Sequence, residues 1–182
     1  MLILNGRKIQ KCWLIMRKSV LALSVTLALI ANTSIAYATL KSDSSSHSVD
    51  SGEIRWGTYH GSTQYTSARD NAISEWDALG HINIAGDTVF TIEDLSFDDY
   101  NMADGYLGWW HKNTGADEIE FNEVYFNVMS DGERNKTALH EMGHALNLAH
   151  TTNQFSVMRE GQISQSVLYQ YDINDYNARW GD

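Results

Sequence analysis

Apolar residues recur at helical spacing in one long segment of the chain and at strand spacing in four others. Between residues 66 and 79 they lie three or four positions apart, at Ala68, Ala72, Ile73, Trp76 and Leu79. This spacing places them on one face of a helix, which Gly80 would end. Residues 53–60, 82–97, 106–110 and 118–128 are instead rich in β-branched and aromatic residues, which favours strands, with a turn at Gly86-Asp87.

Two further helices are predicted nearer the C-terminus. One runs from about Asn135, a suitable N-cap, through Leu146. The other uses Asp172 as its cap and has one apolar face, formed by Ile173, Tyr176 and Trp180. Strands therefore follow one helix and precede another, and this order predicts an α+β domain with one twisted sheet and a few helices packed on it.

The first 38 residues have the pattern of a secretory signal. Five basic residues precede the apolar run 20–30, which is followed by Ala36-Tyr37-Ala38. We therefore expect cleavage after Ala38 and an extracellular protein. An uncleaved membrane anchor is the alternative, although the run is short for a bilayer span. Translation could also start at Met16, because Arg17 and Lys18 alone provide a charged segment.

Removal of this leader divides the chain into three parts and changes its charge. Residues 39–52 are Ser-rich and are expected to form a flexible tail, and residues 53–182 form one folded domain. Five of the 13 Lys and Arg leave with the leader, whereas all 23 Asp and Glu remain. Such an acidic chain is not expected to bind nucleic acid or an anionic membrane. The single cysteine, Cys12, is also removed, which excludes a disulfide and a thiol nucleophile.

The candidate chemistry lies in the stretch HEMGHALNLAH, residues 140–150. Residues four apart share a helix face, so His140 and His144 can aim at one cation. Neutral imidazole suits zinc, which in catalytic sites has three protein ligands and a water. Glu141 would lie beside that water and could act as its general base. Because the surrounding residues are apolar, two buried histidines here need a partner, and a metal ion provides one.

The third ligand requires the chain to turn after His144. His150 is six residues further on and would point elsewhere if the helix continued. Asn147 is a suitable place for the turn, because asparagine tolerates the left-handed conformation that ends helices. His150 could then complete the set of nitrogens.

These residues resemble a known family. His140-Glu141-x-x-His144-x-x-Asn147-x-x-His150 is similar to the HExxHxxGxxH motif of metzincin proteases, and Met158 falls where the family has its Met-turn. The spacing to Met158 is that of matrixins, and the small size and leader resemble snapalysin-like secreted proteases. Weaker similarity extends through most of the domain.

The resemblance implies a zincin-type fold and a protease activity. The fold is a mostly parallel sheet with one antiparallel edge strand, two long helices and a C-terminal helix. The activity is that of a monomeric zinc endopeptidase acting on polypeptides, with one catalytic zinc on His140, His144 and His150, Glu141 as base and Met158 beneath the metal. Three departures are the Asn147 in place of glycine, Glu160 where some relatives have a tyrosine ligand, and the lack of an inhibitory cysteine.

Two alternatives and two weaker features remain open. Glu160 could replace His150 as third ligand, or the protein could bind zinc without turnover. The acidic sets Asp98-Asp99-Asp104 and Asp117-Glu118-Glu120 could hold calcium, or could simply be solvated charge. Finally, Trp109, Trp110 and His111 could border a substrate cleft, although core packing of a tryptophan and surface exposure of His111 explain them equally well.

Overall fold

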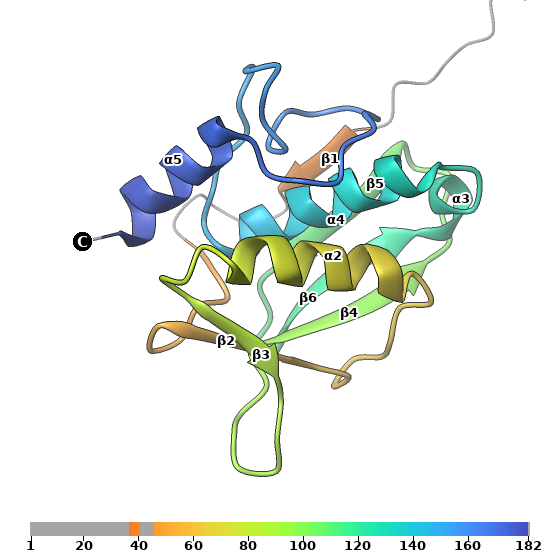
Figure 1. The fold of residues 1–182 in the computed structure, drawn as a ribbon. Coiled ribbons are helices and arrows are strands. Elements are labelled where there is room, and N and C mark those ends of the chain that lie inside the picture. The colour runs from red at the N-terminus through yellow and green to blue at the C-terminus, as the bar shows by residue number, and fades with distance from the viewer. Residues whose placement is uncertain (1–36, 41–45, 182) are drawn as a thin grey trace, which may run out of the picture. The chain divides into compact units, whose positions relative to one another are not determined.

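One six-stranded sheet organises the domain. The computed structural model describes residues 37–40 and 46–181. The strands lie side by side in the order β1-β5-β6-β4-β2-β3 (Figure 1). Their bounds are β1 Tyr37–Leu40, β2 Glu53–Gly57, β3 Asn83–Gly86, β4 Leu95–Tyr100, β5 Tyr106–His111 and β6 Asp117–Asn122.

The strand directions agree with the predicted mostly parallel sheet. β2 is parallel to β3 and β4, and β4 is parallel to β6, whereas β5 is antiparallel to β6. Within β2 to β6, β5 is therefore the antiparallel edge strand. β1 pairs parallel to β5 on its outer side. In the full-length chain the edge of β5 is thus covered by a strand that spans the predicted cleavage point after Ala38.

Two long helices cover one face of this sheet, α2 (Thr66–Asp77) and α4 (Asp131–Ala145). The indole Nε1 of Trp76 in α2 donates to the carbonyl oxygen of Leu139 in α4 at 3.0 Å. The buried face of α2 consists of Ala68, Ala72 and Trp76, as the helical spacing predicts. None of the helices in the described residues is long and apolar enough to cross a membrane.

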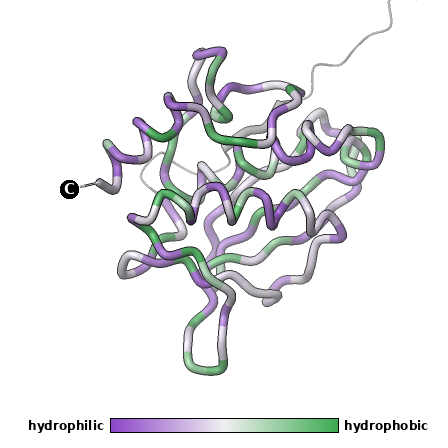
Figure 2. Tube along the Cα trace, viewed as in Figure 1, coloured by the Kyte–Doolittle hydropathy of each residue, from purple (hydrophilic) through white to green (hydrophobic). Residues whose placement is uncertain are grey.

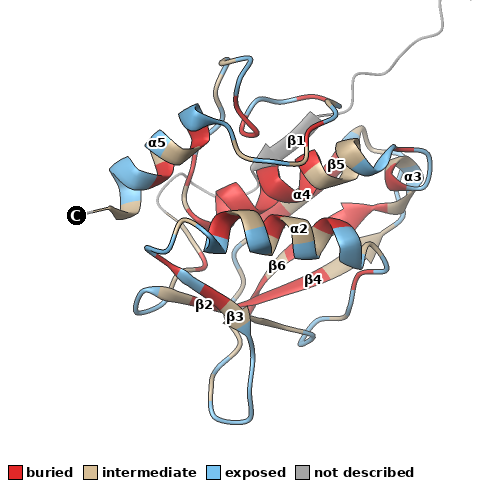
Figure 3. Cartoon of the chain, in the orientation of Figure 1, coloured by how far each residue is buried: buried red, intermediate tan, exposed pale blue. Residues whose placement is uncertain are grey.

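The buried residues follow the strands and α4, as Figure 3 shows in red. A Cβ added at Gly108 of β5 would lie 3.5 Å from the Thr137 side chain, so Gly108 faces α4. Apolar residues also occur at the tip of the β3–β4 loop (Figure 2), where Val89, Phe90 and Ile92 are exposed. The apolar content of 82–97 thus belongs partly to this loop rather than to a continuous strand.

Three of the predicted boundaries differ from the structure because a side chain caps a helix. The strand expected over 118–128 ends at Asn122, whose side chain accepts the backbone N–H of Val124 and starts α3 (Glu123–Phe126). α4 begins at Asp131 instead of near Asn135, because Glu133 accepts the backbone N–H of Ser130 at 2.8 Å.

The C-terminal helix α5 (Gln170–Trp180) begins two residues before its expected cap, Asp172. Asp172 instead occupies the third helical position and accepts the backbone N–H of Tyr169 at 3.0 Å. As predicted, Tyr176 belongs to the buried side of this helix.

Part of the Ser-rich segment is attached to the domain. The backbone N–H of Ser48 donates to the carbonyl of Ala145 at 2.8 Å, and its hydroxyl donates to Asp117 at 2.7 Å. The indole N–H of Trp110 donates to the same hydroxyl. Ser48 is buried, so the ordered domain extends N-terminally beyond the expected start at residue 53. Residues 41–45, also in the expected tail, lie outside the described part of the chain.

Candidate metal centre

Helix α4 places two histidines on one buried face. His140 and His144 are one helical turn apart, and both are almost fully buried. Nδ1 of His140 lies 2.8 Å from the Val157 carbonyl, and Nδ1 of His144 lies 2.9 Å from the Leu148 carbonyl. A carbonyl accepts but cannot donate, so each Nδ1 carries the proton and each Nε2 has a free lone pair.

His150 joins these two residues to form the three-histidine cluster. Its Nε2 lies 3.1 Å from Nε2 of His140 and 3.0 Å from Nε2 of His144, and the latter two atoms are 3.1 Å apart. Zinc–nitrogen bonds of about 2.0–2.1 Å in a tetrahedral shell would separate the nitrogens by about 3.3 Å. The cluster is one of the groups able to hold a metal ion in the described residues, and its geometry fits zinc.

The turn that brings His150 back occurs at Asn147, as predicted. Asn147 has a φ of 62°, in the left-handed region. Its N–H donates to the carbonyl of His144 at 2.9 Å, and the N–H of Leu148 donates to the carbonyl of Gly143 at 2.9 Å. This pair of bonds is the Schellman motif that ends helices. The sequence therefore specifies both the histidine spacing and the turn.

Burial favours the uncharged form of the imidazoles, most strongly for the two helical histidines. Desolvation lowers the pKa of His144 to about 3, and it also lowers the pKa values of His140 and His150. The neighbouring positive charge of Lys136 acts in the same direction on all three. Since a metal binds the neutral ring, the fold holds these side chains in the form that a metal needs.

Glu141 follows His140 in α4 and is fully buried. Neither carboxylate oxygen has a hydrogen-bond partner among the described residues. Burial raises the pKa of this group to about 8, against the opposing effects of the positive charge of Lys136 and of the nearby backbone of Trp110. Burial of a carboxyl in such surroundings is costly, and Glu141 directly follows the first histidine of the cluster in α4.

Met158 is buried against α4 at Gly143, the residue before His144. It is 1% exposed, and a Cβ added at Gly143 would lie 2.3 Å from its sulfur. Gly143 therefore lets the methionine turn approach α4 between the two helical histidines.

Asp172 holds this methionine turn from α5. Its carboxylate accepts the Ser156 hydroxyl at 2.5 Å and the Val157 N–H at 3.0 Å. Because the Val157 carbonyl contacts His140, Asp172 helps to orient a histidine of the cluster. Sequence reasoning treated Asp172 only as a helix cap, and no local pattern indicates this contact with the loop.

Lys136 is a second residue that the sequence did not identify. It is 1% exposed, and its ammonium group donates to the carbonyls of Arg159 and Gly161. Burial lowers its pKa to about 8. Lys136 lies one turn before His140, so it fastens the chain after Met158 to the helix that carries the cluster. A lysine four residues before the first histidine gives the only sequence signal.

Glu160 is placed beside the cluster and not within it. Its carboxylate lies 3.4 Å from Nδ1 of His150, the nitrogen that faces away from the other two rings. His150, and not Glu160, belongs to the group of converging ligand atoms. This geometry favours His150 as third ligand, with Glu160 orienting its ring.

The acidic sets considered for calcium are divided by the pleat of the sheet. Asp117 points inward and is held by Ser48, Lys112 and Asn113, whereas Glu118 lies on the opposite face. Asp99 accepts bonds from Thr63 and Gln64. Within the described residues neither set converges as a whole, because Glu118 and Glu120 group with His111 and not with Asp117. The calcium expectation therefore gains no support from this geometry.

The aromatic run of β5 is divided in the same way. Trp110 faces α4 and is fully buried, which is the packing alternative for a tryptophan. Trp109 and His111 lie on the other face, because alternate residues of a strand point in opposite directions. His111 is there grouped with Glu118 and Glu120 in a second potential metal-binding set, the strand cluster.

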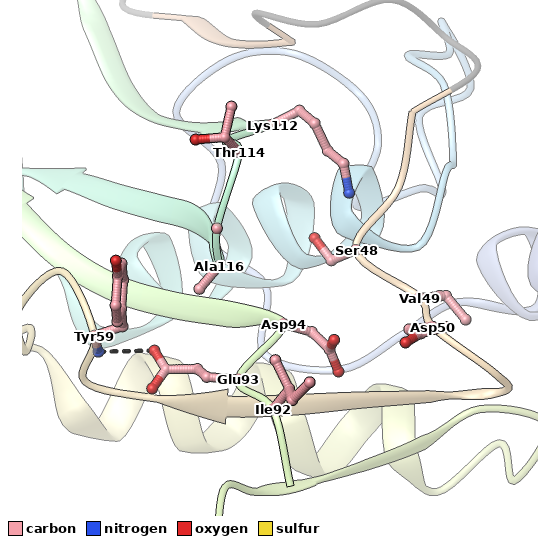
Figure 4. Close-up of a pocket in the computed structure, with 11 residues that line it drawn as sticks. Ser48, Val49, Asp50, Tyr59, Ile92, Glu93, Asp94, Lys112, Thr114 and Ala116 are labelled. Carbon is pink, nitrogen blue, oxygen red and sulfur yellow. Dashed lines mark hydrogen bonds between the residues drawn. The ribbon is translucent and has the colours of Figure 1, made fainter.

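A separate cavity of about 560 Å³ lies between the start of β4 and the β5–β6 connection (Figure 4). Carboxylates project toward it, but they already have partners. Glu93 accepts the N–H of Tyr59 at 2.7 Å, and Asp94 accepts the N–H of Arg55 at 2.7 Å. The three-histidine cluster does not line this cavity, so the cavity adds nothing to the metal chemistry.

Comparison with known proteins establishes the fold and leaves the activity to be inferred. No protein-family model matches the chain, and no curated protein matches its sequence. Among solved structures, the crystal structure of myroilysin matches with a TM-score of 0.57 and 14% sequence identity, over 86% of this chain and 98% of that chain. This likeness, together with the sheet and helices above, confirms the predicted α+β fold of zincin type.

Proposed function

We propose that this protein is a secreted zinc-dependent endopeptidase of the metzincin type. One observation carries the proposal: the Nε2 atoms of His140, His144 and His150 lie within 3.1 Å of one another. Glu141, the residue that follows His140 in α4, is buried, and its carboxylate oxygens have no hydrogen-bond partner among the described residues. The shared zincin-type fold supports the proposal. The leader predicted from the sequence supports the extracellular location.

His140, His144 and His150 would hold the zinc ion. Three nitrogen ligands leave a fourth position for water, which is the arrangement of catalytic rather than structural zinc. The backbone carbonyls of Val157 and Leu148 fix the two helical rings, and Met158 packs against α4. The site is therefore organised before metal or substrate binds.

Glu141 would act as the general base. When bound, zinc would polarise the scissile carbonyl, acidify the attacking water and stabilise the resulting oxyanion. Glu141 would take the proton from that water and deliver it to the leaving amine. Its pKa of about 8 in the fold without metal reflects burial, and a nearby dication would favour the carboxylate form needed for this task.

The substrate would be an extended polypeptide lying beside β5. An edge strand offers unpaired backbone groups to such a segment. In the full-length chain β1 pairs with β5 at this edge. Cleavage after Ala38 would divide β1, so we expect removal of the leader to make the edge available. The acidic chain is proposed to act as a monomer, without nucleic acid or membrane partners.

The decisive experiment is hydrolysis of denatured casein by residues 39–182, with and without a chelator. We expect cleavage that the chelator abolishes and added zinc restores. Glu141→Gln is the matched control, because it keeps the shape of the side chain but cannot serve as a base. Zinc binding without cleavage by the unmodified protein would instead identify a non-catalytic zinc-binding protein.

A further inference from the structure

The face of the sheet opposite α4 carries a second group of ligand-type side chains. His111 of β5 is paired with Glu118 of β6, and Trp109 is paired with Glu120. The backbone register thus brings one imidazole and two carboxylates together. Their potential ligand atoms all lie within 4.8 Å of one another.

Both nitrogens of His111 face carboxylates. Nε2 lies 3.2 Å from Oε2 of Glu118, and Nδ1 lies 3.8 Å from Oε2 of Glu120. The Nδ1 atom is buried and has no hydrogen-bond partner among the described residues. At 3.8 Å it is too far from Glu120 for a hydrogen bond, but two ligands of one metal ion can be separated by this distance.

The two carboxylates need a positive partner. The side chains of Glu118 and Glu120 are 12% and 21% exposed. Among the ion pairs of the described residues, His111 is their only partner. Burial, and then the charge of Glu120, raise the pKa of Glu118, against the opposing effects of His60 and His111. Glu120 also accepts a hydrogen bond from the Trp109 indole, which orients its carboxylate but adds no charge.

We propose that His111, Glu118 and Glu120 bind a second divalent transition-metal ion, distinct from that of the three-histidine cluster. The ligand set of one imidazole and two carboxylates suits zinc and similar ions. Calcium prefers an all-oxygen shell, so the imidazole argues for zinc instead. The proposal does not depend on the peptidase activity.

A metal ion at this position would cross-link β5 and β6. Its ligands come from facing positions of the two strands, and β5 is also the strand whose Gly108 packs against Thr137 of α4. Metal binding to the native state alone would raise the thermal stability of the domain. The ion would therefore hold in place the strand along which the substrate is proposed to lie.

The test starts from purified protein stripped of metal. Titration and elemental analysis then measure how many zinc ions each protein molecule binds. We expect two equivalents for the unmodified protein and one for His111→Gln. His81→Gln is the matched control, since His81 is exposed and outside both clusters, and it should keep two. Glu118→Gln should weaken the second equivalent at least tenfold, and calcium should not displace it.

The reciprocal variant separates this proposal from the proposed function. His140→Gln should lose the first equivalent and keep the one bound by the strand cluster. A single equivalent in the unmodified protein that His111→Gln leaves unchanged would overturn the second site. So would two equivalents retained in both His111→Gln and Glu118→Gln, because other residues would then be the ligands. A protonated His111 bridging the two glutamates would explain the first of these results.

Discussion

The two histidine-containing clusters differ in how the fold holds their ring nitrogens. In the three-histidine cluster, backbone carbonyls fix the rings of His140 and His144, so their free nitrogens converge. In the strand cluster, the ring nitrogens of His111 face side-chain carboxylates instead of backbone carbonyls, and the group is partly exposed. Ligand side chains that the backbone already orients lose less conformational entropy when a metal binds than ligand side chains held by other flexible side chains. We therefore expect a chelator to empty the strand cluster first.

The largest expected effect is on catalysis at the three-histidine cluster alone. Glu141→Gln should lower casein hydrolysis by about 10²- to 10⁴-fold, the usual contribution of a general base. Zinc content should stay unchanged, because Glu141 is not among the converging ligands. Rates and metal content are measured on the same preparation. Hydrolysis at a near-normal rate would exclude Glu141 as the base.

The next largest effect separates the two candidates for third ligand. His150→Ala should sharply reduce the zinc of the three-histidine cluster, while the strand cluster keeps its own ion. The Glu160→Ala variant should still bind nearly one zinc ion at the three-histidine cluster when zinc is saturating. Its zinc affinity should fall by about 10- to 100-fold at most, because Glu160 contacts only the outer nitrogen of His150. If elemental analysis instead finds that Glu160→Ala loses more zinc than His150→Ala, Glu160 is the third ligand.

A third effect concerns pH and the zinc-free protein. Burial raises the pKa of Glu141 from 4.5 in the unfolded chain to about 8 in the fold. The folded state therefore binds the extra proton, and its stability falls as the pH rises from about 4.5 to about 8. Glu141→Gln removes this titration.

We expect the melting temperature of Glu141→Gln to exceed that of the unmodified apoprotein by more at pH 8 than at pH 5. The difference corresponds to a few kcal/mol at most, by about 1.4 kcal/mol per pKa unit. Bound zinc should shrink it, because the cation stabilises the carboxylate. An equal difference at both pH values would mean that Glu141 titrates normally in the apoprotein.

The same contrast between clusters explains what could be read from the sequence. His140, His144 and Asn147 obey local rules of helix spacing and helix ending, which operate within ten residues. The strand cluster depends on the register between β5 and β6, and the register is a property of the folded sheet. The sequence grouped Glu118 with Glu120, but it added Asp117, which points to the other face, and it left out His111.

Long-range contacts also account for the supporting residues that were missed. Lys136 contacts carbonyls more than 20 residues away, and Asp172 contacts Val157 across a loop. Neither contact has a local periodicity. The predicted fold class and the order of the main elements needed only hydrophobic spacing, and they were confirmed.

The smallest expected change in stability comes from the turn on which the three-histidine cluster depends. Asn147 has a positive φ, where a side chain with a branched Cβ is disfavoured. Asn147→Gly should keep zinc and activity, because glycine adopts this conformation without a clash.

Asn147→Val should lose about 1–2 kcal/mol of stability, judged from the left-handed penalty. Continuing the helix instead would carry His150 away from the other two rings, so Asn147→Val should lose zinc at this cluster and activity together. The strand cluster, on the other side of the sheet, should still bind its ion in Asn147→Val, which provides an internal control for folding. Zinc stoichiometry, casein hydrolysis and thermal unfolding of the two variants measure these effects. An Asn147→Val protein that binds both ions and cleaves normally would show that the left-handed turn is not what brings His150 to the cluster.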